Sequence, residues 1–117
     1  MNVANDACLL LCTCPDETTA GPLARALVEE RLAACVSRVP GLRSTYRWEG
    51  KLQEDAEVLL LIKTTAAALE PLQARVLELH PYEVPELVVL DIAGGLPAYL
   101  QWLRDNVSVS EIPPARS

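Results

Sequence analysis

Three stretches of the chain have the apolar pattern of buried β-strands. The run at residues 7–14 (ACLLLCTC) is compact and ends at Pro15, which is typical of a short central strand. Residues 33–39 form a second β-like run, interrupted by Pro40-Gly41, and these two residues predict a bulge or bend. A third run at 87–92 (LVVLDI) predicts another strand, which we expect to be mainly buried.

Residues 43–64 predict one long β-hairpin. In its first half Tyr46 and Trp48 alternate with charged residues, which is the two-residue period of a half-buried strand. Residues 58–62 are continuously apolar, as expected for a strand that is covered on both faces. Gly50 can adopt the positive φ that a tight turn needs. Because such a hairpin is longer than a small domain, we expect Tyr46 and Trp48 to be covered by another copy of the chain.

Apolar residues spaced three and four apart predict three helices. The first is expected just after Pro15, where hydroxyl and acidic side chains suit a helix N-terminus. Thr64 and Thr65 are expected to cap the second helix, which ends at His80 because a proline follows. The third opens at Pro97. The residues expected to face the core are Leu23, Leu27, Val28 and Leu32 in the first helix, Leu69, Leu72, Val76 and Leu79 in the second, and Leu96, Leu100, Leu103 and Val107 in the third.

The order of these elements predicts an α+β fold of the ferredoxin-like, split βαβ type. Two strand-helix-strand halves are joined through a hairpin, which requires an antiparallel sheet and excludes a doubly wound parallel one. One helix is added at the C-terminal end of this βαββαβ sandwich. We expect a single domain over residues 1–107 and a flexible C-terminal tail over 108–117.

Composition narrows the classes of partner. The chain has 117 residues, half of them apolar, and a formal net charge of −6 with no cluster of basic residues. This charge disfavours nucleic acid and favours cations. The absence of a long uncharged apolar stretch argues against a membrane protein, and the N-terminus lacks the basic region of a signal peptide, so we expect a cytoplasmic protein. A core of this size needs no metal or cofactor to fold.

Four cysteines in a cytoplasmic protein are expected to be free thiols. Cys8, Cys12 and Cys14 fall on one face of the first strand with Leu10, whereas Cys35 is distant in sequence. Their spacing matches no zinc finger, and buried cysteines commonly serve as small apolar residues. As thiolates, Cys12 and Cys14 would prefer Cu(I) to Mg²⁺ or Ca²⁺.

The segment at 80–86 (HPYEVPE) has the most unusual composition. It holds the single histidine, His80, with Glu83, Glu86 and two prolines that stiffen the loop. Imidazole and carboxylate together suit first-row divalent metals. Alternatively, His80 only ends the second helix, where a cation is stabilising. With one histidine and no nucleophilic serine in a glycine-flanked turn, we expect no enzyme.

Several separated segments of the chain resemble the CutA family, the divalent-cation tolerance proteins. The matching segments are CTCPDE at 12–17, RLAACV at 31–36, YRWEGK at 46–51, EVLLLIKT at 57–64, HPYEVPEL at 80–87 and YLQWL at 99–103. The resemblance implies a ferredoxin-like subunit in a tight homotrimer, held together through the long hairpin and similar to the PII signalling proteins. It also implies a role in tolerance or response to divalent metals, most often copper.

The same resemblance places the metal ligands on Cys12, His80 and Glu86. This chain has Leu79 where some members carry a second histidine, and Cys14 where many carry alanine. Two functions stay open. The first is a trimeric metal-response protein that binds Cu²⁺ or another divalent cation weakly. The second is a PII-like scaffold whose intersubunit clefts bind a small molecule or a partner protein.

Overall fold

A computed structural model of the chain describes residues 6–108. In chain order the elements are β1 (Ala7–Cys14), α1 (Glu17–Glu29), β2 (Cys35–Trp48), β3 (Lys51–Thr65), a 3-10 turn η1 (Ala66–Ala68), α2 (Leu69–Leu79), β4 (Val88–Asp91) and α3 (Pro97–Asp105). The four strands form one antiparallel sheet in the order β2-β3-β1-β4. This arrangement confirms the predicted split βαβ fold. Apart from Ser108, the predicted tail lies outside the described residues.

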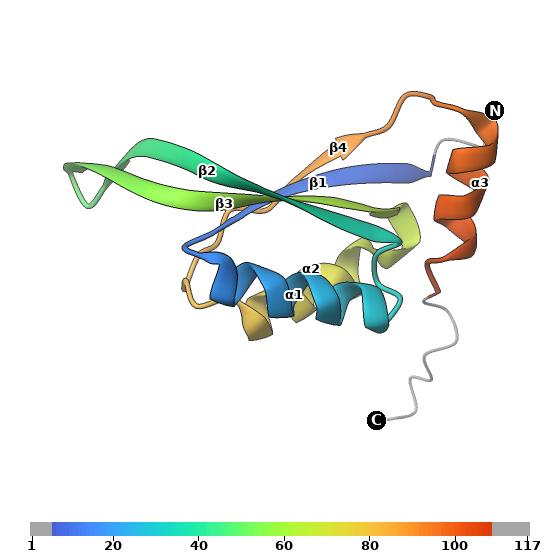
Figure 1. Ribbon diagram of the computed structural model, residues 1–117, viewed down its shortest axis with the longest axis horizontal. Helices are drawn as coiled ribbons and strands as arrows, with labels where there is room; N and C mark the ends of the chain where they lie inside the picture. The colour runs from blue at the N-terminus through green and yellow to red at the C-terminus, as the bar shows by residue number, and fades with distance from the viewer. Residues whose placement is uncertain (1–5, 109–117) are drawn as a thin grey trace.

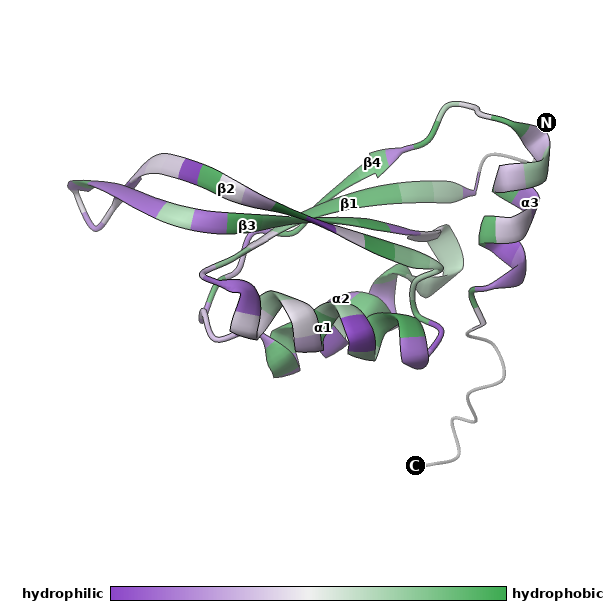
Figure 2. Ribbon diagram, viewed as in Figure 1, coloured by the Kyte–Doolittle hydropathy of each residue, from purple (hydrophilic) through white to green (hydrophobic). Residues whose placement is uncertain are grey.

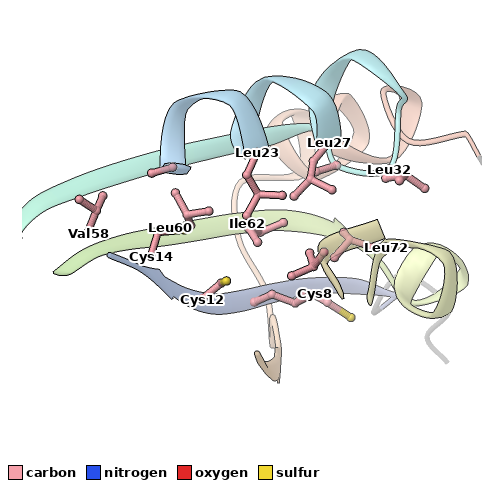
Figure 3. Close-up of a cluster of buried hydrophobic side chains, with 14 residues drawn as sticks. Cys8, Cys12, Cys14, Leu23, Leu27, Leu32, Val58, Leu60, Ile62 and Leu72 are labelled. Atoms are coloured by element: carbon pink, nitrogen blue, oxygen red, sulfur yellow. The ribbon is translucent and has the colours of Figure 1, made fainter. Parts of the chain in front are cut away.

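The main core lies between the sheet and two helices. Figure 1 shows α1 and α2 on the same face of the sheet, with α3 at one end. In Figure 3 Leu23 and Leu27 of α1 face the sheet, where Leu60 and Ile62 of β3 lie beside the cysteines of β1. A smaller cluster joins Leu103 of α3 to Ala7 and Ala34 at the end of the sheet. The fully buried large side chains of the main core are Leu10, Leu23, Leu27, Leu60, Ile62, Leu72 and Val76.

The hairpin of β2 and β3 is the longest feature of the subunit. Its far half projects beyond α1 and α2 (Figure 1). Trp48 pairs with Lys51 across a two-residue turn in which Glu49 and Gly50 have φ of 52° and 80°. Two successive left-handed residues give the turn a twist that matches the strands, so the predicted turn is confirmed. The predicted irregularity at Pro40-Gly41 is also present, as a register shift between Val39 and Leu42.

The predicted capping of the second helix by Thr64 and Thr65 is wrong. Strand β3 continues to Thr65, and Thr65 makes no side-chain hydrogen bond to the 3-10 turn that follows. The hydroxyl of Thr64 instead donates to the backbone oxygen of Leu32 at 2.7 Å. The hydroxyl of Thr64 thus satisfies the buried carbonyl of Leu32. Because both threonines belong to β3, their pairing in the sheet outweighs their local preference for capping a helix.

Three residues predicted to face the core are exposed instead. Val28, Leu79 and Leu96 have 39%, 37% and 71% of their surface accessible. The apolar spacing at these positions is helical, but the layer is only as wide as the contact between helix and sheet, so residues at its margin stay outside. Leu32 is buried as predicted, although it lies beyond the end of α1.

The strand predicted over residues 87–92 is confirmed as β4, but the prediction that it is mainly buried is wrong within one subunit. Val88, Val89 and Leu90 of β4 are 39–46% exposed. Likewise Leu59 and Leu61 of β3 are only partly buried, so residues 58–62 are not fully covered on both faces. Figure 2 shows hydrophobic colouring along β1 and β4. The reason is that β4 is an edge strand and that α1 and α2 cover one face only.

Candidate functional site

Two cysteines at the end of β1 point into the core. Cys12 and Cys14 lie two residues apart in an uninterrupted strand, opposite Leu60 and Val58 of β3. Residues with this spacing share a face, and here it is the face covered by α1 and α2. Both side chains are fully buried. Their predicted place on one strand face is therefore confirmed.

His80 reaches the same point from the end of α2. It caps the helix with an extended backbone, φ −82° and ψ 139°, as expected for a residue before proline. Its ring lies against β1, with Nε2 2.8 Å from the backbone oxygen of Thr13. The backbone N–H of Tyr82 donates to Nδ1 at 3.1 Å. Since Nδ1 accepts this bond, Nε2 carries the proton and donates to Thr13.

The structure thus brings Cys12, Cys14 and His80 together. One ligand atom from each lies within 4.8 Å of the others, and all three residues are buried. His80 does end α2, and it also ties this helix to β1 through the Thr13 carbonyl. Sequence spacing alone did not connect His80 to the cysteines, because the contact depends on how α2 returns to the sheet.

The two thiols influence each other's ionisation. A hydrogen bond between them, followed by burial, raises the pKa of Cys12. The same hydrogen bond lowers the pKa of Cys14. Glu57 opposes ionisation of both thiols, and Glu86 opposes that of Cys12. Of the two thiols, Cys14 is therefore the one that ionises first.

Glu86 lies outside this cluster. Its side chain is exposed and lines a hollow of about 480 Å³ between the hairpin and the loop after α2. Its charge is nevertheless close enough to Cys12 to raise the pKa of that thiol. The other residues that line the hollow are Tyr46, Trp48, Glu57, Tyr82, Glu83 and Val84.

Glu57 and Tyr82 were not singled out by the sequence. Glu57 is only 8% exposed, and the hydroxyl of Tyr82 donates to its Oε2 at 3.0 Å. Burial and this bond raise the pKa of Tyr82. A carboxylate directly before the apolar run at 58–62 was the available signal for Glu57, because a charge within a buried strand needs a partner.

The donor set fits a soft or borderline metal ion. Thiolate and imidazole ligands bind copper and zinc, whereas Mg²⁺ and Ca²⁺ prefer oxygen ligands. Coordination by His80 would require one of its two hydrogen bonds to be exchanged for the ion. Within residues 6–108, the cluster offers two thiols and one imidazole, with Glu86 as a carboxylate nearby.

None of the helices in the described part of the chain has the length and apolar character needed to cross a bilayer.

Comparisons with known proteins identify relatives over nearly the whole chain. Residues 8–106 match the family described as CutA1 divalent ion tolerance protein. The divalent-cation tolerance protein CutA of Thermus thermophilus is 58% identical over 98 residues, which cover 84% of this chain and 95% of that protein.

Solved structures agree with the sequence matches. The divalent cation tolerance protein (Cut A1) from Thermus thermophilus superposes with a TM-score of 0.86 at 56% identity, covering 87% of this chain and 99% of that one. A structure described as the periplasmic divalent cation tolerance protein CutA from Archaeoglobus fulgidus superposes with a TM-score of 0.84 at 29% identity, covering 87% and 99%.

Proposed function

Because the chain belongs to the CutA1 family of divalent ion tolerance proteins, we propose that it acts in metal tolerance by binding a divalent cation, copper in particular. The proposed ligands are Cys12, His80 and Glu86. The observation that carries this proposal is the approach of His80 to the cysteines of β1, within 4.8 Å. Since the ion must displace a hydrogen bond of His80, binding is weak, which suits sensing or sequestration.

The proposed active form is a homotrimer assembled through the long hairpin. Support comes from apolar surface that one subunit leaves uncovered, including Val88 and Leu90 of β4, each 46% exposed, and Trp48 at the end of the hairpin, 53% exposed. Large apolar side chains left exposed in this way are typical of surfaces that contact other protein molecules. In a homotrimer the two other copies of the chain cover this surface, and no other partner is needed.

We propose no catalytic role and a cytoplasmic location. Both ring nitrogens of His80 are engaged by the protein, so it is a poor general base as it stands. Because one relative is described as periplasmic, fractionation of cells is the test of this location.

Titration of the purified protein with Cu²⁺ and with Zn²⁺ tests the metal role. His80→Ala, Cys12→Ser and Glu86→Gln are each expected to weaken Cu²⁺ binding. Cys35→Ser is the matched control for a thiol outside the cluster, and Glu70→Gln the control for an exposed carboxylate. Unchanged affinity in all three site variants would remove these residues from the site.

The second candidate function is a PII-like scaffold that binds a small molecule or a protein partner. It is favoured by the hollow of about 480 Å³ beside the 80–87 loop, whose volume is in the range of ligand sites. Native mass spectrometry of the protein isolated from its own cells would show an added mass that is lost in Trp48→Ala. Protein that carries only metal in this measurement contradicts the scaffold.

A further inference from the structure

Cys14 provides a second thiol that the proposed divalent site does not use. Its Sγ lies within 4.8 Å of that of Cys12, and both side chains are fully buried. A bond between the two sulfurs does not suit this position. The pairing of β1 with β3 is unbroken over residues 7–14, and Cα atoms two residues apart in a regular strand are separated by about 6.6 Å, at the upper end of the disulfide range. At a separation within 4.8 Å, the sulfurs of Cys12 and Cys14 can instead bind one metal ion between them.

The surroundings of the pair restrict which ion it can hold. Two thiolates in an apolar core are soft ligands, and soft ligands select Cu(I) over hard cations. A structural zinc site takes four ligands in a tetrahedron. Among the described residues this cluster offers three donors, and His80 has its nitrogens committed to Thr13 and Tyr82. A low coordination number therefore fits the donors better than a tetrahedral ion does.

We propose that Cys12 and Cys14 form a buried Cu(I) site, with His80 as a positioning residue. The proposal goes beyond the proposed divalent role, because it assigns a monovalent copper ion to Cys12 together with Cys14. On binding, each S–H bond breaks, the proton leaves to solvent, and a Cu–S bond forms, while copper stays Cu(I). His80 holds the Thr13 carbonyl, which lies between the two cysteines, and so fixes the backbone that sets their separation.

The charges around the pair are consistent with this assignment. One Cu(I) with two thiolates carries a single negative charge. Helix α1 begins at Glu17, three residues after Cys14, and the positive end of its dipole stabilises an anion there. The carboxylates of Asp16, Glu57 and Glu86 act on the thiols in the opposite sense. They disfavour free thiolates, and they favour a bound cation that reduces the negative charge of the pair.

The test uses reduced, full-length protein without oxygen, titrated with Cu(I) held by the chromogenic competitor bicinchoninate, and separately with Cu²⁺. Loss of a residue that only supports a metal ligand typically lowers metal affinity by roughly 10- to 100-fold. Because Cys14 is a proposed ligand itself, Cys14→Ala is expected to lower the Cu(I) affinity by more than this. Its Cu²⁺ affinity is expected to stay close to that of the unsubstituted protein. Cys8→Ala is the matched control, because Cys8 is buried on the same face of the same strand. His80→Ala is expected to lower the Cu(I) affinity by less than Cys14→Ala does.

X-ray absorption of the unsubstituted protein loaded with Cu(I) decides the question even where a variant fails to fold. Two sulfur neighbours are expected, and a copper with one sulfur, or with nitrogen and oxygen neighbours alone, overturns the proposal. Cu(I) binding that is insensitive to Cys14→Ala, beside Cu²⁺ binding that depends on His80, contradicts the dithiol site and leaves the proposed function standing. Cu(I) held by both thiols in a protein that binds no Cu²⁺ supports the site and contradicts the divalent role.

Discussion

The two faces of the sheet are made by the same strands and have opposite surroundings. On the face toward α1 and α2, Leu10 of β1 pairs with Ile62 of β3, and both are fully buried. On the other face, Leu11 pairs with Leu61, and both are only partly buried. Both pairs are aliphatic. The difference shows that a single subunit completes the layer toward α1 and α2 and leaves the other face of the sheet only partly covered.

The same contrast separates the two parts of the candidate site. The cluster of Cys12, Cys14 and His80 belongs to the completed layer, and all three residues are buried. The hollow that contains Glu86 lies at the margin, between the hairpin and a loop, and is open to solvent. The soft candidate ligands, the two thiols, are therefore buried, whereas the hard one, the Glu86 carboxylate, is exposed to solvent.

The strongest test of the contrast is Leu61→Glu, which places a charge on the partly buried face. We expect it to abolish the proposed trimer while the subunit keeps its fold, because an interface cannot cover an unpaired carboxylate. Light scattering after size-exclusion chromatography gives the mass, and circular dichroism the fold. Leu77→Glu is the matched control, since Leu77 is 59% exposed on α2, and it should leave assembly intact. A trimeric Leu61→Glu protein would show that this face is not the interface.

The next largest effect is expected from Leu60→Ala on the completed face. Leu60 is fully buried, and removal of such a side chain costs ~2–5 kcal/mol of unfolding free energy. Leu59→Ala, one residue away on the other face, should lower the unfolding free energy clearly less. Both variants are measured by denaturant titration in the Leu61→Glu background, in which the subunit is expected to be unassembled. Equal losses would mean that the two faces are equally packed within one subunit.

A smaller effect is expected from Thr64→Val. Its hydroxyl donates to the Leu32 carbonyl at 2.7 Å, and both residues are buried. Leaving this carbonyl without a donor costs ~1–3 kcal/mol, measured as above. Thr64→Ser keeps the hydroxyl and should recover part of the loss. If serine and valine destabilise equally, the methyl group and not the hydrogen bond is what matters.

The smallest effect is expected from Asp16, whose carboxylate makes the unfolding free energy depend on pH in the acid range. Hydrogen bonds from Thr18 and Thr19 lower the pKa of Asp16 from its ordinary value of 3.8. Because the folded pKa is the lower one, this carboxylate stabilises the fold fully above the unfolded value. The contribution disappears as the pH falls through the folded value. Asp16→Asn still offers a capping oxygen but cannot ionise.

Unfolding free energy measured from about pH 6 to about pH 2 should therefore decline less steeply in Asp16→Asn than in the unsubstituted protein. Asp105→Asn is a suitable comparison, because Asp105 is an exposed carboxylate at the end of α3, outside the α1–α2 layer. An identical decline in Asp16→Asn and the unsubstituted protein would show that the capping bonds are absent in solution.

Much of the fold was predictable from local patterns. The strand over 7–14, the turn at Gly50 and the break before Leu42 each follow from residue types within a few positions. The errors have a common cause. The caps predicted at Thr64 and Thr65, and the burial predicted for β4, depend on contacts with segments distant in the chain, such as the Leu32 carbonyl.

The candidate site was predictable only in part. Cys12 and Cys14 were assigned to one strand face from their spacing, and the structure confirms this placement. Their meeting with His80, and the pairing of Tyr82 with Glu57, were not predictable from spacing. Their metal-binding role stays a prediction.

The sequence by itself determined the order of strands and helices, the hairpin turn and the face on which the cysteines lie, because these depend on short-range periodicity and on the backbone freedom of a few residues. Only the tertiary structure decided that His80 hydrogen-bonds to Thr13, the residue between Cys12 and Cys14. It also decided that Glu86 lies apart from these cysteines and that one face of the sheet is only partly covered. Those outcomes depend on how α2 and its following loop return to β1. A long-range contact of this kind is set by packing of the whole layer, which no local pattern encodes.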